Sequence, residues 1–191
     1  MADCCHSPAA VQNPWLRGVR IVPSPNCNAR PAASVVDLLV IHNISLPPGE
    51  FGSGHIDALF SNTLDCAAHP YFACLRGLQV SAHFLIDRSG TVTQYVPLAL
   101  RAWHAGVSQW EGRDNCNDYS VGIELEGTDT MPFTDAQYQA LAGLTRVLQQ
   151  QFPAITPARI VGHSDIAPAR KTDPGPHFDW ARFRASLVQA V

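Results

Sequence analysis

The stretch VVDLLVI, residues 35–41, decides the fold class because it predicts a buried β-strand. It is a short apolar run rich in β-branched residues, which is typical of a strand covered on both faces, and it ends at His42. The stretch RIVGH, residues 159–163, predicts a further brief strand that ends at His163. A covered strand needs helices on either side of its sheet, which indicates an α/β protein.

Two other stretches add strands to this sheet. YSVGIELEG, residues 119–127, alternates with period two, so its apolar residues face one side while Glu124 and Glu126 share the other. HFLIDRSGTVTQYV, residues 83–96, predicts a hairpin with a turn at Ser89-Gly90.

Helices are predicted between and after these strands. The sequence TDAQ, residues 134–137, is a capping box, and the amphipathic helix that it opens stops before Pro153. An apolar stripe over residues 180–191 predicts a C-terminal helix, and a shorter helix is predicted around residues 56–60. We therefore expect a central mixed β-sheet flanked by α-helices.

Length and composition limit the possible functions. No change in composition divides the 191 residues, so we expect one domain over residues 15–191 after a disordered N-terminus, residues 1–14. The formal charge of -3 and the lack of basic runs exclude nucleic acid and anionic membranes as expected partners. We see no secretion signal and no membrane span, and the six cysteines form no regular framework. These features predict a cytoplasmic protein with free thiols.

The polar loop VGHSDIAPARKTDPGP, residues 161–176, supplies candidate metal ligands. His42 and His163 follow short apolar strands, and ligands in α/β proteins gather at strand ends. The loop offers Asp165 and Asp173 as a third ligand, and a type II turn centred on Pro174-Gly175 would hold Asp173 on a stiff backbone. Two imidazoles and one carboxylate are typical of a catalytic zinc site, in which the fourth position stays open for water.

Five stretches together carry a family resemblance: VIHNISLPPGEFG, HPYF, SAHFLIDRSGTVTQYVPLALRAWHAGVS, NDYSVGIELEGTD and GHSDIAPARKTDPGPHFDWARF. They resemble the AmpD family, the zinc-dependent 1,6-anhydro-N-acetylmuramyl-L-alanine amidases of Gram-negative bacteria. The resemblance runs from about Trp15 to the C-terminus. It implies the fold shared by type 2 amidases and peptidoglycan recognition proteins, a central mixed β-sheet flanked by α-helices.

The resemblance also implies roles for particular residues. Carried over by position, the ligands of one zinc ion per chain fall on His42, His163 and Asp173, the catalytic glutamate on Glu124, and the catalytic lysine on Lys171. Zinc lowers the pKa of a bound water to about 7, and attack on an amide then needs a base and a group that stabilises the oxyanion. By alternation alone Glu126 is as good a candidate for the base as Glu124, and Lys171 is equally compatible with a surface lysine.

Substrate positions are carried over on weaker support. Tyr71 and the stretch Trp103-His104 resemble positions of the substrate cleft, and Arg76, Arg101 and Arg113 are candidates to bind an acidic stem peptide. The assignment leaves out His69, His83 and Asp165.

The function implied is hydrolysis of the amide bond between 1,6-anhydro-N-acetylmuramic acid and L-Ala in soluble muropeptides, during cell-wall recycling. One alternative is a non-catalytic module that binds or senses peptidoglycan, which we would expect to lack ligands or the base. Another is a lytic amidase of polymeric wall, which would need a route out of the cell.

Overall fold

The computed structural model of the protein describes residues 15–188. The expected disordered N-terminus, residues 1–14, and Val191 at the end of the C-terminal apolar stripe lie outside the described residues. Among residues 15–188, no helix has both the length and the apolar character needed to cross a bilayer.

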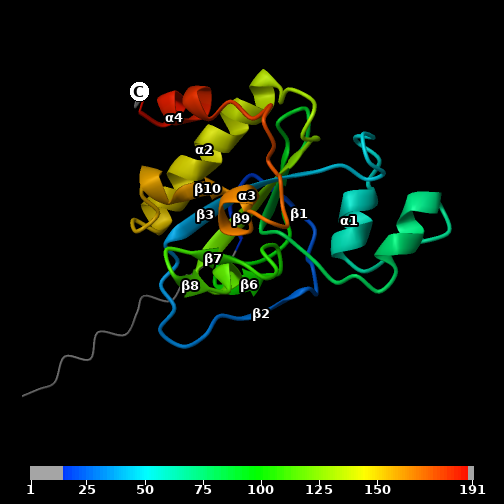
Figure 1. Cartoon of the computed structure of the whole chain (residues 1–191), viewed down its shortest axis with the longest axis horizontal. Helices are drawn as coiled ribbons and strands as arrows, with labels where there is room; N and C mark the ends of the chain where they lie inside the picture. The colour runs from blue at the N-terminus through cyan, green and yellow to red at the C-terminus, as the bar shows by residue number, and fades with distance from the viewer. Residues whose placement is uncertain (1–14, 189–191) are drawn as a thin grey trace, which may run out of the picture.

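A mixed sheet of six strands forms the centre of the molecule (Figure 1). In spatial order the strands are β1 (Arg20–Ile21), β5 (Val92–Gln94), β4 (Phe84–Ile86), β9 (Ser120–Glu126), β3 (Leu38–Ile44) and β10 (Ile160–Gly162). The pairs from β4 to β10 are parallel, and β5 is antiparallel to β4. The predicted mixed α/β architecture is therefore confirmed.

Helices and two small ribbons complete the fold. The α-helices are α1 (His55–Phe60), α2 (Asp135–Gln151), α3 (His163–Ile166) and α4 (Trp180–Val188). The 3-10 helices are η1 (Pro70–Leu75), η2 (Cys116–Asp118) and η3 (Pro157–Arg159). The ribbons pair β2 (Cys27–Ala29) with β6 (Leu100–Ala102), and β7 (Gln109–Trp110) with β8 (Arg113–Asp114).

Local sequence signals explain where several elements begin and end. At the start of α2 the Thr134 hydroxyl accepts from the Gln137 amide at 3.1 Å while the Gln137 side chain accepts from the Thr134 amide at 3.0 Å, which confirms the predicted capping box. The predicted hairpin is present as β4 and β5, but its turn is centred on Arg88-Ser89, one residue earlier than predicted. The reason is Gly90, which follows the turn with φ 86° and closes it by a hydrogen bond to the Asp87 carbonyl.

The sheet buries both of its faces but uses them differently. One face of β3 and β9, with Leu39, Ile41 and Ile123, packs under α2 and α4 in the main hydrophobic core. The opposite face carries apolar residues such as Val40, which pack near α3, and then polar residues toward the carboxyl ends of the strands. This second face carries the candidate site.

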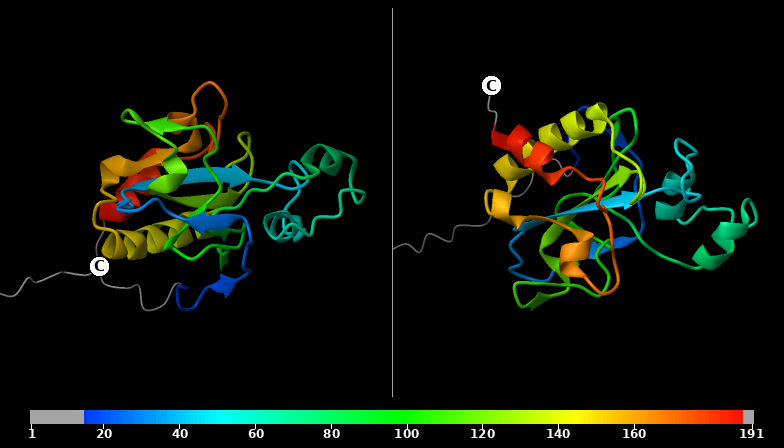
Figure 2. Two further views of the ribbon diagram at one scale, coloured as in Figure 1. Left: turned by 90° about the horizontal axis from the view of Figure 1, so that it is seen from below. Right: turned by 45° about the horizontal axis from the view of Figure 1, so that its top comes forward.

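A lobe formed by α1, η1 and their connections projects from the body on the side away from α2 and α4 (Figures 1 and 2). Its interior is a separate apolar cluster in which Phe60 and Phe72 pack with Leu85 and Tyr95 of the sheet region. The polar face of the sheet therefore has this lobe on one flank and α3 on the other.

Candidate active site

His42 and Glu124 lie side by side on the central strands. They are direct partners in the parallel pairing of β3 with β9, so their side chains leave the sheet on the same face. His163 reaches the same place because β10 pairs with β3 and places Gly162 opposite Ile41. The strand predicted to end at His163 ends at Gly162, and His163 is the first residue of α3.

Asp173 comes to this face on the loop that follows α3. The backbone carbonyl of Asp173 accepts from the Ser164 amide at 2.9 Å, which ties the loop to α3. A turn closes from the Gly175 amide to the Thr172 carbonyl at 3.0 Å, and the Asp173–Pro174 peptide is cis. The predicted type II turn centred on Pro174-Gly175 was therefore wrong, because a cis proline occupies the third position of a turn and not the second.

The three expected metal ligands converge. His42 Nδ1 lies 2.9 Å from His163 Nδ1, and both nitrogens lie 3.0 Å from Asp173 Oδ2. These ligand atoms belong to one cluster that could hold a metal ion. Tetrahedral zinc with bonds of about 2.0–2.1 Å would require ligand atoms roughly 3.3 Å apart, which is close to the observed triangle.

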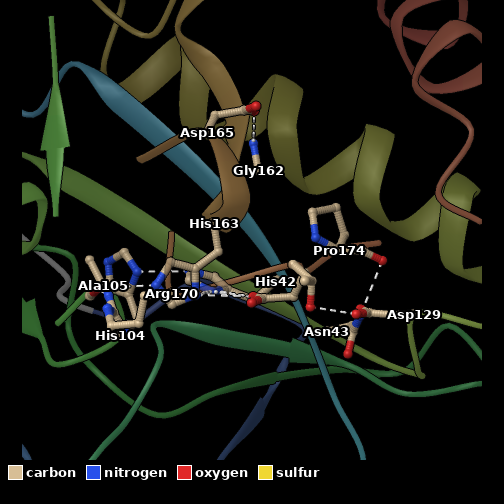
Figure 3. Close-up of polar contacts among 12 residues, drawn as sticks. His42, Asn43, His104, Ala105, Asp129, Gly162, His163, Asp165, Arg170 and Pro174 are labelled. Atoms are coloured by element: carbon tan, nitrogen blue, oxygen red, sulfur yellow. Dashed lines mark hydrogen bonds and ion pairs between the residues drawn. The ribbon is translucent and has the colours of Figure 1, made fainter. Parts of the chain in front are cut away.

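The far side of each imidazole indicates which nitrogen carries the hydrogen (Figure 3). His163 Nε2 lies 3.0 Å from the Ala105 carbonyl, which only accepts, so Nε2 donates and Nδ1 keeps its lone pair. His42 Nε2 lies 2.9 Å from His104 Nδ1. Burial lowers the pKa of His42 to about 4, against the opposing effect of Asp173, so this ring is neutral at pH 7.

The charge balance of the cluster fits a cation. Burial alone would raise the pKa of Asp173, but its contacts with His163 and His42 outweigh that effect and hold the pKa below its ordinary value. An ionised carboxylate and two imidazole lone pairs within 3.0 Å of one another repel unless a positive charge lies between them. Nitrogen and carboxylate donors in this number are those that zinc takes in catalytic sites, so the residues present fit zinc.

Glu124 is poised beside this cluster without a partner of its own. Its Oε2 is buried and has no hydrogen-bond partner among the described residues. Burial raises the pKa of Glu124 well above its ordinary value, the charge of Asp173 raises it further, and the Lys171 ammonium opposes both. A carboxyl group of this kind is suited to accept and return a proton.

Glu126 has a different environment on the same strand face. Its side chain is buried, and its carboxylate accepts from the backbone amides of Gly52 at 2.6 Å and Arg88 at 3.3 Å. Glu126 thereby connects the loop before α1 to the hairpin turn, and it does not line the cavity described below.

Lys171 lies on the loop that carries Asp173 and contributes to the same cavity. It is the only lysine in the sequence, and the other twelve basic side chains are arginines. Its neighbour Arg170 points elsewhere, donating to the carbonyls of Ala105 at 2.6 Å and Val107 at 2.7 Å.

A cavity of about 230 Å³ opens over the cluster. His42, His163 and Asp173 line it together with Glu124 and Lys171. Its remaining walls include Tyr71, Trp103 and His104 and a set of apolar residues from the lobe and adjacent loops: Leu46, Leu59, Phe60, Leu75, Leu78 and Val80. One hollow therefore joins the polar cluster to an apolar wall.

The expected arginines are placed elsewhere. Arg76, Arg101 and Arg113 are absent from the described residues that line the cavity. Arg113 pairs with Asp37 at 2.6 Å and its guanidinium lies 3.7 Å from the centre of the Tyr119 ring, while Arg101 pairs with Asp118.

The three residues left out of the assignment have structural contacts. The His69 ring accepts from the Tyr71 amide at the start of η1, and Asp165 accepts from the Gly162 amide at 2.7 Å (Figure 3). His83 is fully buried, with Nδ1 accepting from the Gly122 amide at 3.1 Å.

A polar clamp that the sequence did not reveal holds the loop that carries Asp173 (Figure 3). Asn43 Nδ2 donates to Asp129 Oδ1 at 2.7 Å and to the Pro174 carbonyl at 3.0 Å. The other Asp129 oxygen accepts from the Thr172 hydroxyl at 2.5 Å. Asn43 directly follows His42, an expected ligand, and could have been noticed, but nothing in the sequence marks Asp129, which lies 86 residues further on.

Comparison with known proteins agrees with this geometry. Residues 32–176 match the family model of N-acetylmuramoyl-L-alanine amidases. The chain is 62% identical over 170 residues to the 1,6-anhydro-N-acetylmuramyl-L-alanine amidase AmpD of Escherichia coli K12, covering 89% of this chain and 92% of that protein. It superposes on a crystal structure of a selenomethionine AmpD derivative with a TM-score of 0.89 at 60% identity, covering 91% and 97% of the two chains.

A more distant structure includes a ligand. The amidase AmiD of Escherichia coli, in complex with the substrate anhydro-N-acetylmuramic acid-L-Ala-D-gamma-Glu-L-Lys, matches with a TM-score of 0.60 at 32% identity. That match covers 85% of this chain and 62% of AmiD.

Proposed function

The chain belongs to the N-acetylmuramoyl-L-alanine amidase family, in its AmpD group, and from this premise we propose how it acts and on what. It is an amidase that hydrolyses the bond between 1,6-anhydro-N-acetylmuramic acid and L-Ala of muropeptides, a reaction of cell-wall recycling. The observation that carries this conclusion is the 62% identity to AmpD over nearly the whole of both chains. We place this activity in a single domain over residues 15–191.

We propose that His42, His163 and Asp173 hold one zinc ion per chain. The convergence of their ligand atoms and the need for a positive charge between them support this assignment. Zinc bound there would supply Lewis-acid activation of water and of the scissile carbonyl.

Glu124 is the proposed general base. It neighbours His42 across the strand pair, lines the cavity, and has a buried oxygen without a partner, so it can take a proton from the attacking water. The protonated carboxyl can then pass that proton to the departing L-Ala amine. Without this second transfer the amine would leave as an unstable anion.

Lys171 is the proposed oxyanion stabiliser. Its ammonium lines the same cavity and its charge acts on Glu124 and on His42, so it lies near the reacting atoms. Negative charge develops on the carbonyl oxygen only as the water attacks, and a cation fixed beforehand stabilises that charge without reorganisation.

The apolar wall of the cavity is the proposed binding surface for the sugar and the lactyl group. Tyr71 and Trp103 lie on it, and the Trp103 indole is fixed by donation to Asn28 at 2.9 Å. Ring faces of this kind pack against the apolar face of a sugar while its hydroxyls stay in water.

We propose that the enzyme acts in the cytoplasm on soluble fragments. The cysteines at positions 27, 66, 74 and 116 are free thiols, and one of them is exposed, which suits a reducing compartment.

Mass spectrometry of a purified anhydromuropeptide after incubation with the protein tests the function. We expect release of the intact stem peptide from the anhydromuramyl sugar, and loss of this activity with a chelator. His42→Ala and Asp173→Ala should lack both zinc and activity, whereas full zinc content in both variants would contradict the ligand assignment. Hydrolysis of intact sacculi at the same efficiency as the soluble fragment would contradict the recycling role.

A further inference from the structure

A chain of buried hydrogen bonds runs from His42 to a backbone carbonyl. His42 Nε2 lies 2.9 Å from His104 Nδ1, His104 Nε2 lies 3.1 Å from Ser120 Oγ, and Ser120 Oγ lies 2.5 Å from the carbonyl oxygen of Cys116. The most exposed of these residues is His104, at 9%. Each polar atom along the chain is therefore satisfied by the next and not by solvent.

The direction of the whole chain is determined at its far end. The Cys116 carbonyl only accepts, so the Ser120 hydroxyl donates to it and accepts from His104 Nε2. A neutral His104 with hydrogen on Nε2 has a lone pair on Nδ1, which accepts from His42 Nε2. His42 is then left with its own lone pair on Nδ1, the atom that faces His163 and Asp173.

The rings of His42 and His163 are thus both oriented by hydrogen bonding that ends at a backbone carbonyl, directly for His163 and indirectly for His42. His163 donates directly to the Ala105 carbonyl, whereas His42 needs two intervening side chains to reach the Cys116 carbonyl. Both ring nitrogens of His104 are occupied by protein partners, which leaves it no polar atom for substrate.

Space for the His104 ring comes from Gly122 on β9. A Cβ atom at this position would lie 2.5 Å from Cγ and 2.6 Å from Nδ1 of His104, much closer than atoms can approach. The glycine in the sequence SVGIE therefore lets the His104 imidazole pack directly against β9, the strand next to the one that carries His42.

We propose that His104 and Ser120 are positioning residues that fix the tautomer of His42 and aim its Nδ1 lone pair into the metal site. The inference rests on the proposed metal site. It adds a series of hydrogen bonds that supports the His42 ring and begins at the Cys116 carbonyl of η2. Outer partners of this kind fix the ring orientation of a ligand histidine, and their loss commonly weakens metal binding by about 10- to 100-fold.

Three variants and a matched control test the proposal. His104→Phe keeps a flat ring but removes both nitrogens, while His104→Asn returns an amide oxygen near the position of Nδ1. Ser120→Ala breaks the series of hydrogen bonds one residue further from His42. Ser108→Ala is the control, because Ser108 is also a buried serine hydrogen-bonded to the Cys116 backbone, through the amide at 3.1 Å, but has no hydrogen bond to His104 or His42.

Zinc affinity, measured by competition with a chelator, should fall about 10-fold or more in His104→Phe. It should fall less in Ser120→Ala, recover in His104→Asn, and stay within about 2-fold of wild type in Ser108→Ala. Nitrogen-15 NMR of the zinc-loaded wild type should show His104 with hydrogen on Nε2 and a coupling across the hydrogen bond from His42 Nε2 to His104 Nδ1.

Hydrogen on His104 Nδ1 in the wild type would overturn the proposal, as would equal zinc affinities in Ser120→Ala, Ser108→Ala and His104→Phe. Should His104→Phe fail to fold, Ser120→Ala and the wild-type spectrum still decide. A wild type that binds no zinc would instead overturn the metal site on which the inference rests.

Discussion

Glu124 and Glu126 are identical side chains two residues apart on one face of β9, and their contacts separate their roles. Glu124 has a buried oxygen without a partner beside the cluster of His42, His163 and Asp173, whereas Glu126 accepts from the amides of Gly52 and Arg88. The alternation in the sequence could not distinguish them, because it reports the face on which a side chain lies and not what it meets there.

We predict that Glu124→Gln lowers kcat by roughly 100-fold or more while zinc stays bound, since the amide keeps the size of the side chain but cannot take a proton. The matched change Glu126→Gln should leave kcat near wild type and lower the free energy of unfolding, because it weakens two hydrogen bonds to a carboxylate. Steady-state kinetics, zinc content and urea denaturation of the two variants separate these effects. Near wild-type turnover in Glu124→Gln would remove this residue as the base.

Replacement of Lys171 tests its proposed role as the oxyanion stabiliser. Lys171→Ala should retain zinc but lose about 3 kcal/mol of transition-state stabilisation, or roughly 100-fold in rate. The loss should appear in kcat and not in KM, because the charge meets the oxyanion only as it forms. Lys171→Arg, which keeps the charge, should be less impaired, and a rise in KM alone in Lys171→Ala would assign the lysine to substrate binding.

At the scale of elements, the loop that carries Asp173 depends on partners distant in sequence. Asp129 holds Asn43 with one oxygen and Thr172 with the other, so the end of β3 and the loop that carries Lys171 and Asp173 are fastened to one carboxylate. Loss of this clamp should misplace Asp173 by a small amount, and such errors matter in a metal site because bond lengths are strict.

We predict that Asp129→Ala weakens zinc binding and lowers kcat, with a much smaller effect on thermal stability. Asp135→Ala is the matched control, because the Asp135 carboxylate also holds a residue distant in sequence, through an ion pair with Arg182 at 2.7 Å, but lies at the start of α2. Chelator competition, kinetics and thermal unfolding of both variants provide the comparison. Equal zinc affinities in the two variants would show that the loop holds Asp173 without Asp129.

Elements were predictable where the signal is local. The α2 capping box needs only four consecutive residues, and β3 and β10 are visible as short apolar runs. The bounds of β3 were less predictable, because the strand begins at Leu38 and not at Val35 and continues past His42 to Ile44. The turn at Asp173–Pro174 was mispredicted because sequence does not report the isomer of a prolyl bond. The clamp and the His104 chain were out of reach because they join residues that only the sheet brings together.

At the scale of the whole molecule, buried histidines couple folding to pH. Burial lowers the pKa of His83 to about 3, with the nearby Arg30 guanidinium, 3.2 Å from Nε2, acting in the same direction. In the unfolded chain the pKa is about 6.5, so between these values only the unfolded chain binds the proton. The stabilisation is therefore complete above about pH 6.5 and is lost progressively as the pH falls toward 3.

We predict that stability falls on acidification with a contribution from His83 of about 1.4 kcal/mol per pH unit. His83→Asn keeps an acceptor for the Gly122 amide but does not titrate, so its free energy of unfolding should depend less steeply on pH by that amount. Urea denaturation of the two proteins at several pH values between about 4 and 6, with chelator present, measures the difference. Parallel pH profiles would show that His83 does not contribute.

The use of a single lysine has a practical consequence for chemistry on this protein. Within residues 15–188, every ion pair formed by a lysine or arginine side chain belongs to an arginine, and the one lysine amine lines the cavity over His42, His163 and Asp173. An amine-reactive reagent therefore has one target besides the α-amino group. Acylation of Lys171 removes its positive charge and leaves the arginine ion pairs intact. Stoichiometric labelling would count active sites directly, and an isotopically labelled methyl group on that nitrogen would be a lone spectroscopic reporter of whatever enters the cavity.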